Sequence, residues 1–481
     1  MIKYIFLKEL QCHVLNRSIT FTWALIICLF VLNASISVFQ YSDLQKKHEE
    51  VVKRTRQLLE YDFTEGWPRE LFSKLNGQPF ERVNTLPTLV TMSQKISQPP
   101  SSLIFMSGTS AGIVPDGSTV RCFEEPEFTS FFHYNPYINP YFSIDWTTLM
   151  IYVISFLCIC FSYNAFSGEK EDGTFKLMFS NDLSRSTVIY AKFLGLLVVF
   201  LIPVLLGIMV SCLIFEFSPV FDMGQTEYAK IAWFFVVSVL LISLTILSGF
   251  LVSVLTHKSY VSLVICLLCW TMMAIIIPNV SWIITRQTDL IPTETTIRQE
   301  ERQQIDALKD CYMGWAGHQN IEKVIQRKEC IDRQTAVHNS LWGGFHNMQF
   351  DQTNIAIGMS KISPFGLFRF LGDRISGNNY YGYVSFFEQV KNYQLAYRQY
   401  IISKDSADPE SQHIIWNEEG LCQYVMSNQK VNLAEIPELN VQQASFGDVV
   451  AGSLMDVAIL CLWCIGLFAA TFVGFIRYDV R

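Results

Sequence analysis

Long apolar stretches alternate with polar stretches along the chain. Six of the apolar stretches reach the ~20 residues that a helix needs to cross the hydrocarbon core of a bilayer. Five of them contain no charged residue, and the sixth contains a single acid, Asp456. The pattern therefore predicts six transmembrane helices, which cover residues 19–39, 146–166, 193–215, 231–255, 259–285 and 451–475.

The polar stretches differ greatly in length. Residues 1–18 place apolar side chains at three- and four-residue spacing among lysines and an arginine, which predicts an amphipathic elbow helix in the membrane interface. Residues 40–145 and 286–450 together provide enough chain for one folded domain with its own core. The predicted fold is an α-helical membrane protein, with six transmembrane helices and a mixed α/β external domain formed by two insertions.

Local patterns add detail to the two insertions. Helical spacing of apolar residues beyond residue 40 predicts that the first transmembrane helix continues out of the membrane. The runs TLVTM and SSLIFM predict short strands or an irregular packed loop. The second insertion predicts a helical hairpin that breaks near 314–317, and a further helix over 386–403.

Composition supports a membrane protein and limits its partners. Only 16% of the residues are charged, against ~25% in a soluble globular protein. The formal net charge is −7, and no basic stripe is present to neutralise phosphates, which argues against nucleic acid as a partner.

Lysine and arginine are denser in 1–18, 167–192, 256–258 and 477–481 than in the two insertions. Short loops rich in these residues stay on the cytosolic side. The sequence thus predicts a multi-pass protein of the cell's inner (cytoplasmic) membrane. Both termini, including the 476–481 tail, are then cytosolic, and the large domain is periplasmic or extracellular.

Cysteine positions follow the same division. Four of the 13 cysteines lie in the insertions, namely Cys122, Cys311, Cys330 and Cys422. An even number in an oxidising compartment permits disulfides, with free buried thiols as the alternative.

Motifs for nucleotide and zinc binding are missing from the sequence. It contains no G-x-x-x-x-G-K-[ST] phosphate loop and no H-E-x-x-H. Its histidines lie singly, whereas zinc sites need three or four ligands. The sequence therefore predicts a chain that is not an enzyme and that holds no metal, cofactor or ATP of its own.

Asp456 lies about one and a half turns into the last predicted transmembrane helix. Ionisable residues inside a membrane are costly and often functional. A residue at the headgroup boundary, in reach of outer water, is the alternative interpretation, so the sequence leaves the role of Asp456 open.

The segment SGEKEDGTFKLMFSNDLSRS, which begins at Ser167, places a charged element between two transmembrane helices. Thr174 can cap a short helix in which Phe175, Met178 and Phe179 share one apolar face. Glu169, Glu171 and Asp172 precede it, and Gly173 is predicted to act as a hinge. Such a helix suits docking on a cytosolic partner, and an interfacial helix without a partner is the alternative.

This segment resembles the cytosolic segment between the second and third helices of ABC type-2 exporter permeases. SKISPFGLFRFLGDRISG, LKEL near the start and the six-helix count add to the resemblance, while Asp182 and Phe175 depart from the usual Pro and Leu. The matching positions are Gly168, Glu169, Glu171, Gly173, Thr174, Lys176, Leu177, Ser180, Ser184, Arg185, Lys192 and Gly195.

The resemblance implies a permease subunit of an ABC transporter, energised by two copies of a separate cytosolic ATPase that binds the ATP. A second permease copy or a related permease would complete the complex. A non-transporting complex that moves an external domain is the alternative, whereas a receptor without an ATPase leaves the motif unexplained. The implied ATPase-coupling residues are Glu169, Glu171, Gly173, Thr174, Phe175, Met178, Phe179 and Arg185.

We predict a disulfide between Cys311 and Cys330, because a hairpin that breaks near 314–317 can bring their Cα atoms within the ~4.4–6.8 Å that a bridge requires. Cys122 and Cys422 would form a second bridge that links the two insertions. Intact-mass analysis after denaturing alkylation without reductant measures this. Four alkylated thiols at these positions would contradict it.

We also predict that residue 406 lies outside the cell membrane. A cysteine introduced as Ser406→Cys should react with an impermeant thiol reagent in intact cells or spheroplasts, above the labelling of the unmodified chain. Labelling that requires membrane disruption would invert the predicted orientation.

Overall fold

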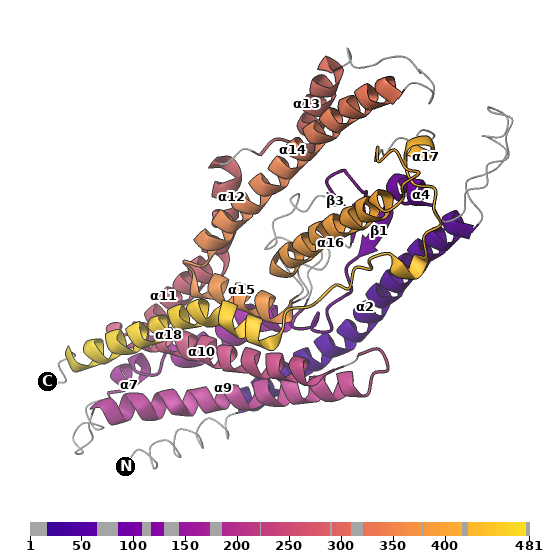
Figure 1. Ribbon diagram of the computed structural model, residues 1–481. Coiled ribbons are helices and arrows are strands. Elements are labelled where there is room, and N and C mark those ends of the chain that lie inside the picture. The colour runs from indigo at the N-terminus through magenta and orange to yellow at the C-terminus, as the bar shows by residue number, and fades with distance from the viewer. Residues whose placement is uncertain are drawn as a thin grey trace.

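The computed structural model describes residues 17–64, 85–107, 117–128, 144–173, 185–221, 223–288, 291–308, 321–377, 380–415 and 422–477. Within these residues, six helices are long and apolar enough to cross a membrane, and they coincide with the six predicted stretches. The predicted helical membrane fold is therefore confirmed. Figure 1 shows the long helices α9, α10 and α18 running side by side, with α13, α14 and α16 extending away from them.

Several of the six membrane-length helices are built from consecutive elements. The first is α2 (Arg17–Thr64), which continues well beyond membrane length, as predicted. The second joins α5 (Trp146–Thr148), the π-helical turn η1 (Leu149–Ile154) and α6 (Ser155–Ser162). The others are α9 (Arg185–Glu216), α10 (Gln225–Leu255), the series α11 (Ser259–Thr271), η2 (Met272–Ile276) and α12 (Ile277–Thr288), and α18 (Phe446–Arg477).

Helix α10 lies at the centre of this bundle. It packs against α6, α9, α11 and α18, and its apolar window is 61% buried, against 17% for the fifth and sixth membrane-length helices. Trp146 and Phe234 pack ring to ring inside the bundle, with their centroids 5.9 Å apart. The weakly covered fifth and sixth helices leave apolar surface for lipid or protein to cover.

Proline explains the π-helical turn in the fifth helix. Pro278 lacks an N–H, and its ring clashes with the carbonyl four residues earlier in a regular α-helix. That carbonyl belongs to Ala274, within η2, where the wider turn gives it room. The neighbouring carbonyl of Met273 accepts a hydrogen bond from the hydroxyl of Ser363, so another element supplies a donor that the helix lacks.

The described parts of the two insertions pack into one body, which we call the insertion lobe. Its helices are α4 (Leu86–Thr91), α13 (Glu294–Ala307), α14 (Ile321–Ser360), α16 (Tyr380–Ser406) and α17 (Cys422–Val425), with a short 3₁₀ turn, η4 (Leu433–Glu435). Leu86 and Leu89 of the first insertion share an apolar cluster with Tyr397 and Ile401 of the second. Both insertions thus contribute to one core.

A small antiparallel sheet with the order β1-β2-β3 completes the lobe. It consists of β1 (Gln94–Ser97), β2 (Gly117–Val120) and β3 (Glu127–Phe128). Gln94 pairs with Val120, and Ser118 pairs with Phe128. Strand β1 also packs on the extension of α2, where the hydroxyl of Thr55 donates to the carbonyl of Lys95 over 3.0 Å.

The local predictions for the insertions have mixed outcomes. The run TLVTM is not a strand or an irregular loop but belongs to α4, because Pro87 at the helix start favours the first turn and Leu86, Leu89 and Val90 bury one helical face. SSLIFM forms irregular turns, and α16 contains the predicted helix over 386–403. Helices α13 and α14 pack together as a hairpin requires, although its break lies outside the described residues.

Helix α15 (Pro364–Ser376) joins the lobe to the bundle. Every residue of α15 except Arg374 is buried, which is unusual for so short a helix, and it packs against α5, α10, α14, α16 and α18. Ser363 caps it by accepting hydrogen bonds from the backbone N–H groups of Phe365 and Gly366. A left-handed Gly377, with φ 67°, ends it.

We predict that Gly372→Ala destabilises the protein. A Cβ at Gly372 would lie 2.3 Å from Oγ1 of Thr147, whose hydroxyl already donates to the carbonyl of Met106 over 2.8 Å. Such overpacking costs ~1–3 kcal/mol. Gly358→Ala in α14 is the matched control, because a Cβ there meets nothing within 4 Å. Thermal unfolding in detergent should give a lower midpoint for Gly372→Ala alone, and equal midpoints for both variants would refute this packing argument.

Candidate functional site

The candidate site lies at the base of the charged segment that follows the second membrane-length helix. The chain leaves α6, turns, and forms α7 (Ser167–Glu171). Figure 1 shows α7 at the same end of the bundle as the C-terminal end of α18. Helix α7 is only five residues long, so its position depends on the contacts that its side chains make.

Ser253, in the last turn of α10, holds the start of α7. Its hydroxyl oxygen accepts hydrogen bonds from the backbone N–H groups of Phe166 and Ser167, over 3.0 and 2.9 Å. The side chains of Ser253 and Ser167 lie 3.2 Å apart and are fully buried. The first N–H groups of a helix have no partner within the helix, so Ser253 satisfies donors that the apolar surroundings would otherwise leave unbonded.

Lys170 caps the end of α10. Its ammonium donates to the carbonyl oxygens of Ser253 and Thr256, over 3.4 and 3.0 Å, and also to that of Val254. The last carbonyls of a helix lack intrahelical partners and carry the negative end of the helix dipole. One cation therefore satisfies several acceptors at once and gains from the dipole.

The two glutamates of α7 contact two other helices. Oε2 of Glu171 accepts a hydrogen bond from the backbone N–H of Ser259 over 3.2 Å, at the start of α11. Oε1 of Glu169 pairs with Nζ of Lys192, in α9, over 2.8 Å. The side chain of Lys192 is only 10% exposed, so this ion pair is partly shielded from water.

Three consecutive charged residues thus reach three different helices. Successive positions on an α-helix point about 100° apart, because there are 3.6 residues per turn. Glu169 therefore faces α9, Lys170 faces the end of α10, and Glu171 faces the start of α11. A displacement of α7 would act on all three helices together.

Gly173 redirects the chain after α7. Its φ of +72° lies in the left-handed region, and a Cβ there would meet nothing within 4 Å. The strain of a larger residue would therefore come from the backbone conformation rather than from crowding. The predicted hinge corresponds to this left-handed turn.

The predicted coupling residues fall into two groups. Thr174, Phe175, Met178 and Phe179 lie outside the described residues, and Arg185 begins α9 with a side chain that is not described. The described ones, Glu169, Glu171 and Gly173, sit together at the base, where both acids bond within the chain. Their role in ATPase coupling stays a prediction.

Sequence reasoning missed the partners of this base, namely Lys170, Ser253 and the N–H of Ser259. A usable signal was present, because Lys170 stands between two acids one turn beyond a transmembrane helix and Ser253 ends another. Spacing within one helix cannot tell which second helix lies opposite.

Asp456 forms an ion pair with Lys361, which follows α14. Nζ of Lys361 lies 3.0 and 2.7 Å from the two carboxylate oxygens. The Asp456 side chain is 9% exposed, so it is largely shielded rather than open to water. Lys361 follows a helix of the insertion lobe and Asp456 lies in α18, so this contact ties the lobe to α18. Removing either partner would leave the other charge uncompensated in a largely shielded place.

The predicted disulfides remain predictions. Cys311 lies outside the described residues, while Cys330 is buried in α14. Cys122 and Cys422 lie in the same apolar cluster, and burial raises the pKa of the Cys122 thiol to about 12. At neutral pH this thiol is therefore almost fully protonated and reacts slowly while the protein is folded.

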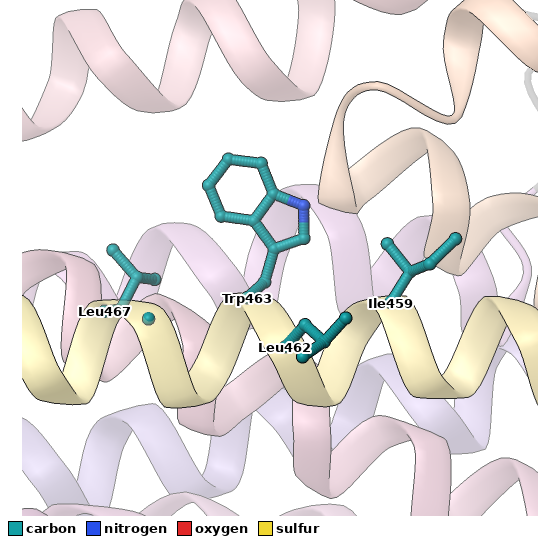
Figure 2. Close-up of a pocket in the computed structure, with 5 residues that line it drawn as sticks. Ile459, Leu462, Trp463 and Leu467 are labelled. Carbon is teal, nitrogen blue, oxygen red and sulfur yellow. The ribbon is translucent and has the colours of Figure 1, made fainter.

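No group of three or more His, Cys, Asp or Glu side chains that could hold a metal ion occurs among the described residues. A shallow hollow on α18 is lined by apolar side chains, and Figure 2 shows Ile459, Trp463 and Leu467 projecting from one side of that helix. The lining offers little to orient a polar ligand, so a lipid tail or another apolar helix suits it best.

Comparison with known proteins agrees with this architecture. A family model described as "ABC-2 family transporter protein" matches residues 4–480, which is nearly the whole chain. No curated protein matches the chain.

Proposed function

Because the chain belongs to the ABC-2 family of transporter proteins, and is thus a permease subunit of an ABC transporter, we propose that it is an exporter subunit driven by a separate cytosolic ATPase. The ATPase would contact the segment over 168–185. The permease would pair with a second copy or a related permease, and two ATPase copies would serve the pair.

The attachment of α7 to three membrane-length helices carries this proposal. A segment that only connects two helices needs no such attachment, whereas a segment that transmits movement must be bonded to the helices that it moves. Glu169, Lys170 and Glu171 provide the base, which ends at the left-handed Gly173. The apolar face formed by Phe175, Met178 and Phe179 would then enter a groove on the ATPase, as amphipathic helices do in partner grooves.

The proposed mechanism is mechanical. ATP binding closes the ATPase pair and displaces the docked helix. The displacement reaches α9, α10 and α11 through the bonds of α7, and the helices rearrange to extrude a substrate. Since α10 lies at the centre of the bundle and packs on α6, α9 and α18, its movement involves most of the other helices.

A second candidate function follows from the insertion lobe. Helix α15 and the Lys361–Asp456 pair connect the lobe to α10 and α18, so movement of the bundle would also move the lobe. In this alternative, the complex transports nothing, and ATPase motion drives the lobe to act on an extracytoplasmic partner. Both functions place the protein in the cytoplasmic membrane, with its termini cytosolic and the lobe outside.

We predict that docking and transmission can be separated by mutation. Phe179→Asp would bury an unpaired carboxylate in the ATPase contact, and Gly173→Pro would misdirect the helix, so both should lose the ATPase during purification in mild detergent. Lys170→Met keeps the docking face but leaves the carbonyls at the end of α10 without their donor, which costs ~1–3 kcal/mol. It should retain the ATPase and lower coupled ATP turnover several-fold.

Two substitutions serve as controls. Ser406→Asp places a new carboxylate on an exposed site of the lobe, and Lys258→Met removes an exposed lysine close to the base. Both should retain partner and turnover. If Phe179→Asp keeps the ATPase and full turnover, the segment is not the coupling element. If Lys170→Met behaves like Lys258→Met, α7 does not transmit the motion.

A further inference from the structure

A small cavity lies where the bundle meets the insertion lobe. Its volume is about 230 Å³, and residues of α10, α15, α16 and the start of α18 line it, together with two loops. Three charged residues contribute to the described lining, namely Lys230, Arg374 and Asp448. The cavity is distinct from the base of α7, which lies at the other end of α10.

Lys230 is a buried cation that forms no ion pair with any residue that the structure describes. It lies in the second turn of α10 and is 4% exposed. No polar group among the described residues hydrogen-bonds to it or forms an ion pair with it, although the carboxylate of Glu227, three residues earlier, is near enough to attract it. The other buried lysine among the described residues, Lys192, pairs with Glu169, so Lys230 differs from it. An unpaired ammonium in such a place is costly unless a ligand accompanies it.

Arg374 adds a second positive charge to the same cavity. Its guanidinium lies 4.0 Å from the centre of the Tyr381 ring, and its buried Nε has no hydrogen-bond partner. Gly452 of α18 makes room for it, because a Cβ there would lie 2.1 Å from Nη1. The guanidinium is thus positioned by stacking and shape, while hydrogen-bond donors remain available.

Asp448 does not neutralise these cations. Its carboxylate accepts hydrogen bonds from the backbone N–H and the hydroxyl of Ser445, over 3.3 and 2.7 Å, and so caps α18. It pairs with neither Lys230 nor Arg374. The cavity therefore holds two positive charges against one carboxylate that is already bonded.

We propose that this cavity binds an oxyanion of the phosphate class. Arginine presents donors in a fork that matches phosphate, lysine supplies a point charge, and the amides of Gln98 and Gln443 add uncharged donors to the wall. The volume is below the ~300–1,000 Å³ typical of sites for drug-sized ligands, so a single phosphate group fits best.

Two sources can supply that group. Lys230 lies near the end of a membrane-length helix, where we expect the lipid headgroups, so the phosphate can belong to a phospholipid. The cavity also touches lobe loops that leave the membrane, so a free oxyanion is the other source. The chemistry is the same in both cases, and the probes below separate them.

The test measures thermal unfolding of the full-length chain in detergent. The probes are sodium phosphate and a short-chain phosphatidylglycerol, each compared with potassium chloride at matched ionic strength, because salt screens charges. A ligand that binds only the folded state raises the midpoint with concentration. Lys230→Met, Arg374→Gln and the control Lys258→Met are compared with the unmodified chain.

The unmodified chain and Lys258→Met should show a rising midpoint. Lys230→Met and Arg374→Gln should need at least about tenfold more probe for half the effect, as loss of a charged hydrogen bond implies. Lys230→Met should fold, because it removes an unpaired buried charge, and Arg374→Gln tests the site independently. Response to phosphate supports a free oxyanion, and response to the lipid alone supports a headgroup. Equal responses in all four proteins, or none in the unmodified chain, would overturn the proposal.

Discussion

Backbone groups at a helix end need hydrogen-bond partners, and water cannot supply them where that end is buried. The structure meets this requirement with side chains from other elements. Lys170 and Ser253 bond the ends of α10 and α7, and Glu171 bonds the start of α11. The hydroxyl of Ser363 does the same for a carbonyl at the π-helical turn of the fifth helix. Each cap therefore also joins two elements, so the need for satisfied backbone groups fixes how the helices are connected.

Helix α15 applies the same principle at the other end of the bundle. Its apolar side chains pack on two sides, with Phe368 and Leu371 in the bundle core and Phe370 in a cluster with Tyr383 of the lobe. Its Asp373 bonds inward, where the carboxylate accepts a hydrogen bond from the hydroxyl of Ser107. A helix buried on all sides cannot shift without moving both bodies. Bundle and lobe are thus mechanically connected, whichever of the two candidate functions applies.

Much of the fold could be predicted because membrane thickness imposes a length that apolar stretches reveal directly. The six helices followed from this length. The continuation of α2 beyond the membrane followed from the helical spacing of its apolar residues. The candidate site was harder. Spacing identified Gly173 as a hinge, but the bonds of Glu169 and Glu171 depend on which helices lie opposite, which is tertiary information. TLVTM failed as a strand because Pro87 and burial on one face outweighed its β-branched residues. The Lys361 partner of Asp456 lies 95 residues away, beyond any local pattern.

The arrangement of three partners around α7 also constrains the length of the chain. Substituting one of its charged residues removes the contact with one helix and leaves the other two in place. Inserting or deleting a single residue rotates the rest of the helix by about 100°, so every later side chain would face the wrong neighbour. The contacts of this short helix therefore depend on the direction in which each side chain points as much as on its chemistry. Length variation should be tolerated far better after Gly173, which follows the three anchoring residues, than between Ser167 and Glu171.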